Sequence, residues 1–106
     1  MRGDVFVNNM TIERGALVYE GDTVYTLGRS FVVLQFTDGS KVTVRPDSQL
    51  VLDKYRSNKV QLDLVSGGLR VVTGAIAKSN PENYKVSTKT ALMGVRGTEF
   101  SVQIVD

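Results

Sequence analysis

The sequence "FVVLQFTDGSKVTVR", residues 31–45, contains two runs of alternating apolar residues joined by Asp38 and Gly39. Alternation with a period of two is typical of a strand with one buried face, so this stretch predicts a β-hairpin. A two-residue loop at Asp38-Gly39 would pair Leu34 with Thr43 and mix apolar with polar side chains on each face. That register leaves no continuous apolar face, which argues against it.

A three-residue loop over residues 37–39 gives a better register. With Gly39 in the left-handed conformation of a G1 bulge, Leu34 pairs with Val42 and Val32 pairs with Val44. The apolar side chains then share one face: Val32, Leu34, Phe36, Val42 and Val44. We therefore predict a bulged hairpin that contributes this face to a hydrophobic core.

The rest of the chain repeats short strand-like runs that end at Gly, Asn, Asp or Pro. Strands are expected at residues 5–7, 10–12, 16–19, 23–26, 31–37, 41–45, 49–54, 59–65, 69–73, 75–78, 83–88 and 99–105. Only residues 74–83 also allow a single helical turn. The pattern predicts an all-β fold, either a compact sandwich or a solenoid-like stack of many short strands.

The composition sets broad limits on the class of protein. The chain has 106 residues, with 42% hydrophobic and 23% charged, and we expect one domain, residues 1–106, of a longer protein. The sequence has 13 basic and 11 acidic residues, and a net charge of only +2 does not indicate an anionic partner. No apolar run approaches the ~20 residues of a membrane span, so we expect no membrane insertion of this segment.

Catalytic and metal-binding residue types are scarce in this sequence. It contains no cysteine and no histidine, which excludes thiolate metal sites and the usual nucleophilic triads. Glu20 and Asp22 flank Gly21, a spacing typical of a polar turn. Ser40 and Lys41 are neighbours on one strand and therefore point to opposite faces. We expect no enzyme activity, no metal and no cofactor.

The sequence "ALMGVRGTEFSVQIV", residues 91–105, places Arg96 between Gly94 and Gly97. Counting back by twos from Ile104 puts Arg96, Gly94 and Leu92 on the inward face of a strand. Two outcomes remain open. Either Gly97 supplies a bulge that turns the guanidinium outward, or the guanidinium is buried and paired with a carboxylate. In both cases the expected role is architectural, and a buried, paired Arg96 would cost ~3 kcal/mol or more when changed to Ala.

Four segments occur in an order and spacing that resemble the FecR domain family. They are "YEGDTVYT" (19–26), "VLQFTDGSKVTVRPDSQLVLDKY" (33–55), "LVSGGLRVVTG" (64–74) and "YKVSTKTALMGVRGTEFSV" (84–102). The residues that carry the resemblance most specifically are Gly21, Asp22, Asp38, Gly39, Gly94, Arg96, Gly97, Thr98 and Phe100. The resemblance implies an all-β domain outside the bacterial cytoplasmic membrane, in the periplasm or at the cell surface. In the founding regulators this domain passes a signal from an outer-membrane transporter, through a membrane helix, to an anti-sigma region.

The leading functional hypothesis is a non-catalytic interaction or sensing module that presents sheet edges and loop tips to a protein partner of the cell envelope. The candidate contact residues are Lys54, Tyr55, Arg56, Lys59 and Tyr84. The two tyrosines act as anchors only if they are exposed, and the alternative is that both cover the core.

A second hypothesis is a small β-barrel that binds single-stranded nucleic acid or an anionic cell-wall glycan. Nucleic acid is not the expected partner, because three aromatic residues that could stack on bases are expected in the core. These are Phe31, Phe36 and Phe100.

Overall fold

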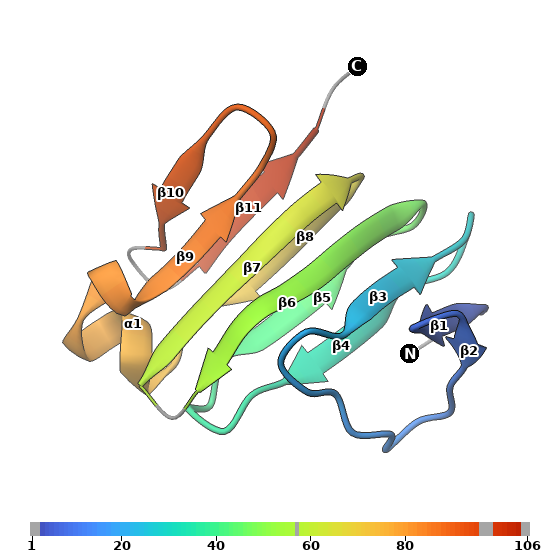
Figure 1. Ribbon diagram of the computed structural model, residues 1–106, viewed down its shortest axis with the longest axis horizontal. Coiled ribbons are helices and arrows are strands. Elements are labelled where there is room, and N and C mark those ends of the chain that lie inside the picture. Colours follow the sequence, from blue (N-terminus) through green and yellow to red (C-terminus); the bar gives the residue numbers. More distant parts are fainter. Residues whose placement is uncertain (1–2, 57, 96–98, 105–106) are drawn as a thin grey trace.

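The computed structural model describes residues 3–56, 58–95 and 99–104 and consists mainly of strands (Figure 1). Within these residues the strands are β1 (Val5–Val7), β2 (Met10–Thr11), β3 (Thr23–Thr26), β4 (Val32–Gln35), β5 (Lys41–Val44), β6 (Ser48–Arg56), β7 (Lys59–Ser66), β8 (Gly68–Val72), β9 (Tyr84–Ser87), β10 (Leu92–Gly94) and β11 (Glu99–Gln103). A short helix, α1 (Ala75–Ser79), and a 3-10 turn, η1 (Pro81–Asn83), connect β8 to β9. The prediction of an all-β fold is confirmed.

The strands form two sheets. One sheet has the order β10-β9-β7-β6-β3-β1-β2, and the other has the order β11-β8-β5-β4. The chain passes repeatedly between the sheets, and β7 and β9 pair in parallel because α1 and η1 form part of a long crossover. In Figure 1, β5 and β8 lie behind β6 and β7, so the architecture has two layers. The solenoid-like alternative is not confirmed.

One hydrophobic core joins the two sheets. Alternate residues of β6 and β7 point inward, and their leucines at positions 50, 52, 62 and 64 are fully buried. Alternate residues of β5 and β8 meet them from the four-stranded sheet, with Val42 and Val71 fully buried. Each such side chain contributes about 1.5–3 kcal/mol of burial free energy, and strands this short depend on that contribution for stability.

The predicted hairpin is confirmed in register and loop type. Leu34 pairs with Val42 and Val32 with Val44. Gly39 has φ 88°, and the loop is closed by the Phe36 amide, which donates to the Ser40 carbonyl at 2.9 Å. The predicted apolar face is buried at all five positions: Val32, Leu34, Phe36, Val42 and Val44.

Two predicted strands are wrong in type, and one observed strand was not predicted. Residues 16–19 form no strand and belong to neither sheet among the described residues. The segment expected as a strand at 75–78 is helix α1, the helical alternative noted for 74–83; the run Ala-Ile-Ala-Lys is too short for its period to distinguish the two. Strand β10 was not predicted, since it is only three residues long and ends at Gly94, a residue type that is depleted in strands.

The alternation counted back from Ile104 does not continue into β10. Strands β10 and β11 belong to different sheets, so a single period cannot run through both. Leu92 was expected on the inward face but is 58% exposed, and Gly94 is also exposed. Val95, which is out of phase with the expected pattern, is fully buried instead.

Candidate functional site

A groove of about 920 Å³ opens between the segment 12–19 and strand β4. Its walls are largely apolar, and Arg56 and Tyr55 from the end of β6 contribute to its lining. Strand β4 is the last strand in the order of the four-stranded sheet, so the groove runs along a sheet edge. The volume lies in the range of typical ligand sites, about 300–1,000 Å³.

The wall formed by residues 12–19 is held to the body of the protein by two apolar side chains. Ile12 and Val18 are partly buried and pack against the core. Between them the Ala16 amide donates to the Glu13 carbonyl at 3.1 Å, which turns the chain. Leu17 is left 74% exposed, so this wall presents apolar surface to solvent.

The turn at Gly21 and Asp22 fixes the end of this wall. Gly21 has φ 89°, a left-handed conformation that favours glycine, and its amide donates to the Leu52 carbonyl of β6 at 2.7 Å. The Asp22 carboxylate accepts hydrogen bonds from the Tyr19 amide and from the Asn8 side chain, both at 2.8 Å. The predicted motif residues Gly21 and Asp22 therefore position the segment that borders the groove.

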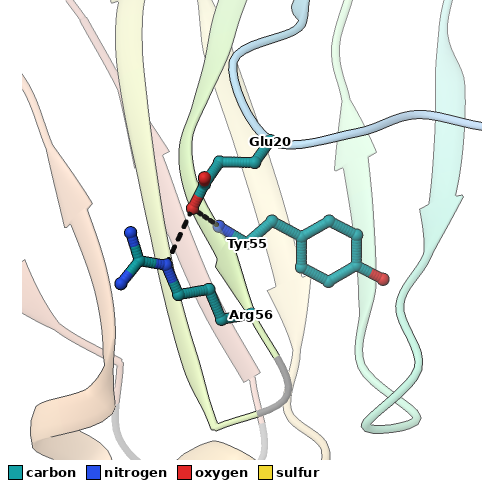
Figure 2. A network of polar contacts seen from close by, with 3 residues as sticks. All are labelled: Glu20, Tyr55 and Arg56. Carbon is teal, nitrogen blue, oxygen red and sulfur yellow. Dashed lines mark hydrogen bonds and ion pairs between the residues drawn. The ribbon is translucent and has the colours of Figure 1, made fainter.

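Glu20 connects the same segment to the end of β6 (Figure 2). Its Oε1 accepts a hydrogen bond from the Tyr55 amide at 3.1 Å and from Arg56 Nε at 3.2 Å. The bond from the Tyr55 amide, together with the Arg56 guanidinium, lowers the pKa of the Glu20 carboxyl below its usual value. Both charged side chains remain well exposed, so this ion pair orients the groove wall more than it stabilises the fold.

The Tyr55 ring is turned inward by an irregularity in β6. The pairing with β7 shifts between Leu52 and Lys54, which changes the phase of the side chains beyond it. Tyr55 then pairs with Val60 and packs against Phe36, with ring centroids 4.7 Å apart. It is half-buried at the inner end of the groove, between the edge of the core and solvent.

A second polar cluster lies inside the β4–β5 hairpin. Ser40 is fully buried, and its hydroxyl donates to Asp38 Oδ1 at 2.6 Å. Since that hydroxyl has one proton, the bond of 3.0 Å between Ser40 Oγ and Tyr84 Oη has Tyr84 as its donor. Burial raises the pKa of the Tyr84 hydroxyl well above its usual value, which keeps it protonated.

The same aspartate attaches the hairpin to α1. The Asp38 carbonyl accepts from the Ala75 amide at 2.8 Å, and its carboxylate accepts from the Ile76 amide at 3.3 Å. Gly74 permits this approach, because a Cβ atom there would collide with the Asp38 carbonyl and the Ser40 amide. Asp38 thus holds the β4–β5 hairpin against α1.

The candidate contact residues do not all lie on the surface. Tyr84 is fully buried against Ser40, so the prediction that it anchors a partner is wrong. Arg56 is exposed beside the groove, and Tyr55 is half-buried within it. Lys54 and Lys59 are half-buried near the end of the β6–β7 hairpin, and neither lines the groove.

The predicted motif around Arg96 falls largely outside the described residues. Arg96, Gly97 and Thr98 are among the positions not described, so the choice between a buried and an exposed guanidinium stays a prediction. On either side of them, Gly94 is exposed in β10, and Phe100 in β11 is half-buried and packs against the core.

The described residues contain no group of three or more acidic side chains that could hold a metal ion. No helix among them has the length and apolar character needed to cross a membrane.

Phe31 was expected in the core but is 36% exposed, because it precedes β4 on the outward phase of its alternation.

Sequence reasoning did not find the groove. The signal lies in the segment 16–19, where the alternation predicts a half-buried strand but the apolar side chains Leu17 and Tyr19 are exposed. Without knowing that this segment faces β4, the sequence pattern could not indicate a shared surface.

Comparison with known proteins identifies one family. The family model described as FecR protein matches residues 22–106. The match begins at the Asp22 turn and covers the hairpin, the core strands and the Arg96 segment. Searches of curated proteins and of solved structures gave no match to this chain.

Proposed function

The chain belongs to the FecR family, and we propose that it acts there as a non-catalytic module that binds a protein partner in the cell envelope. FecR proteins form a regulatory, non-enzymatic family, and their domains are generally extracytoplasmic. Family membership therefore supports a regulatory role for this chain. The finer proposal is that partner binding relays an envelope signal toward an anti-sigma and sigma-factor system.

The observation that carries the proposal is the groove along β4. An open sheet edge beside exposed apolar side chains is a surface that protein partners recognise. Leu17 and Tyr19 are 74% and 62% exposed on one wall, and Val33 is 39% exposed on the other. These side chains gain burial free energy when a partner covers them.

The same geometry gives less support to nucleic acid or glycan binding. Such ligands need a basic groove, often with exposed aromatic platforms. Arg56 at the groove is already paired with Glu20, which leaves less positive charge for a polyanion. The charged side chains on the groove walls, Glu13, Arg14 and Arg56, include both signs and form no basic surface.

The test compares three ligand classes with one purified protein. The chain is immobilised and exposed to an envelope extract, and retained proteins are identified by mass spectrometry and then verified with the purified partner. In parallel, binding to a single-stranded oligonucleotide is measured over a range of salt concentrations, and co-sedimentation is measured with purified cell-wall sacculi. The proposal expects a specific protein partner that binds reproducibly in purified form. Tight binding to sacculi or oligonucleotide without any protein partner would contradict it.

A further inference from the structure

Strand β4 has one paired side and one open side. Its residues pair with β5 from Val32 to Gln35, and within the described residues β4 is the terminal strand of its sheet. A terminal strand presents backbone donors and acceptors that a second chain can satisfy. The groove lies along this open side.

The phase of the hydrogen bonds shows which residues supply those groups. The Phe36 amide donates to the Ser40 carbonyl, and the Phe36 carbonyl accepts from the Gly39 amide at 3.0 Å. In an antiparallel pair, residues directed toward the partner strand alternate with residues directed away from it. Leu34 and Val32 therefore point their backbone groups toward β5. The backbone groups of the alternate positions point into the groove.

Those alternate positions are Val33 and Gln35, and both line the groove. The next position in the same phase supports the assignment, because the Thr37 amide points away from β5 and donates to Tyr55 Oη at 3.2 Å. Val33 and Gln35 thus present two N–H and two C=O groups, repeated at the spacing of an extended chain.

The proposal rests on the proposed function and names its binding site. We propose that the groove between residues 12–19 and β4 binds an extended, uncharged segment of a partner protein, which pairs with Val33 and Gln35 as an additional strand. Backbone pairing gives the affinity, and alternate apolar side chains of the segment contact the groove walls.

The charge of the groove favours an uncharged segment. Glu13 and Arg14 are neighbours of opposite sign on one wall, and Arg56 is neutralised by Glu20. A run of acidic or basic residues in the partner would meet charges of its own sign as well as opposite ones, with no net electrostatic gain. Apolar side chains of the partner segment would contact Val18 and Tyr55, which line the groove and pack against the core.

A second copy of the chain fits this site poorly. Its own β4 is bordered by its own residues 12–19, and it forms a hairpin with β5. A groove that is walled on both sides accepts a single extended segment more readily than the edge of another sheet. The paired length of β4, from Val32 to Gln35, is also short for a symmetric dimer interface of about 1,200–2,000 Å².

The experiment uses isotope-labelled protein and a synthetic peptide of roughly eight residues that alternates valine and threonine, with a serine at each end and both termini blocked. Saturable changes in the amide signals of Val33, Gln35 and residues 12–19 are expected. A matched peptide, N-methylated at alternate residues, keeps the side chains but loses half of its backbone donors, and it is expected to bind about tenfold more weakly. Equal binding of the two peptides, saturable changes confined to another sheet edge, or no binding would overturn the proposal.

Protein variants test the same pairing from the other side. Gln35→Pro removes one N–H that points into the groove, at an edge position where proline is tolerated, and it should weaken peptide binding about tenfold. Gln35→Ala keeps that N–H and should bind within about twofold of the unmodified protein. If Gln35→Pro disturbs the amide spectrum of the whole domain, Leu17→Asp replaces it, since Leu17 is exposed and the added charge should also weaken binding several-fold.

The variants also separate this inference from the proposed function. If the captured envelope protein binds Leu17→Asp and Gln35→Pro as tightly as it binds the unmodified chain, the protein-binding function stands and the groove assignment fails. If no purified envelope protein binds the unmodified chain, the proposed function itself fails.

Discussion

Tyr84→Phe is expected to destabilise the protein at neutral pH and to lose this effect in alkali. The variant removes the buried hydroxyl that donates to Ser40 Oγ. Loss of one buried hydrogen bond costs about 1 kcal/mol of the free energy of unfolding. Ser40 keeps its bond to Asp38, so no further polar group is left without a partner.

The pH dependence follows from the raised pKa of Tyr84 in the folded protein. In the unfolded chain this hydroxyl ionises near its usual pKa of about 10, whereas in the folded protein it stays protonated to higher pH. The stability that it contributes is therefore complete below about pH 10 and falls as the pH rises further, by about 1.4 kcal/mol at pH 11. That loss is similar in size to the hydrogen bond itself.

The assay is urea unfolding of both proteins at about pH 8 and about pH 11. The unmodified protein is expected to be more stable than Tyr84→Phe by about 1 kcal/mol at the lower pH, and the difference should disappear at the higher pH. Tyr25→Phe is the control at about pH 8, since the Tyr25 side chain is 40% exposed, and it should change the free energy of unfolding by less than about 0.5 kcal/mol. A Tyr84→Phe difference that is unchanged at pH 11 would refute the buried arrangement of Tyr84.

Further variants test the packing and the exposed ion pair. Gly74→Ala should destabilise by about 1–3 kcal/mol in urea unfolding, because its Cβ would collide with the hairpin backbone, whereas Gly28→Ala should change stability by less than about 0.5 kcal/mol; equal effects would contradict the close approach. Leu62→Ala should cost about 2–5 kcal/mol, and Leu92→Ala less than about 0.5 kcal/mol; a large loss at Leu92 would mean that β10 faces the core. Glu20→Gln should lower the melting temperature slightly at low salt near neutral pH, because a carboxyl whose pKa is lowered in the folded protein contributes its full stability above its usual pKa of about 4.5. The effect of the substitution should vanish as the pH falls below that value, and a large effect that persists in acid would contradict the exposed ion pair.

The sequence predicted local structure best where turn chemistry and periodicity agree. The hairpin register follows from Gly39 and from the two strands beside it, all within residues 31–45. The core face of this hairpin could therefore be derived without knowledge of the rest of the chain. The strand prediction for residues 75–78 failed, because a run of this length fits both a strand and a helical turn.

Contacts between segments that are distant in the sequence could not be predicted, because local periodicity does not specify which segments pair. The groove depends on residues 12–19 facing β4, and nothing in either segment specifies the other. The inward turn of Tyr55 depends on a shift in the β6–β7 register, which simple alternation does not anticipate. The sequence alone does not show whether Tyr84 is buried or exposed, because its burial depends on the contact with Ser40 in the folded protein.

Amide hydrogen exchange along β4 tests the central claim most directly, because binding at the groove requires an open edge with a defined phase. The amides of Val32 and Leu34 are expected to exchange slowly, since they point toward β5. The amides of Val33 and Gln35 are expected to exchange much faster in the isolated protein. Slow exchange at Val33 and Gln35, equal to that of their neighbours, would mean that the edge is already covered and would contradict the account.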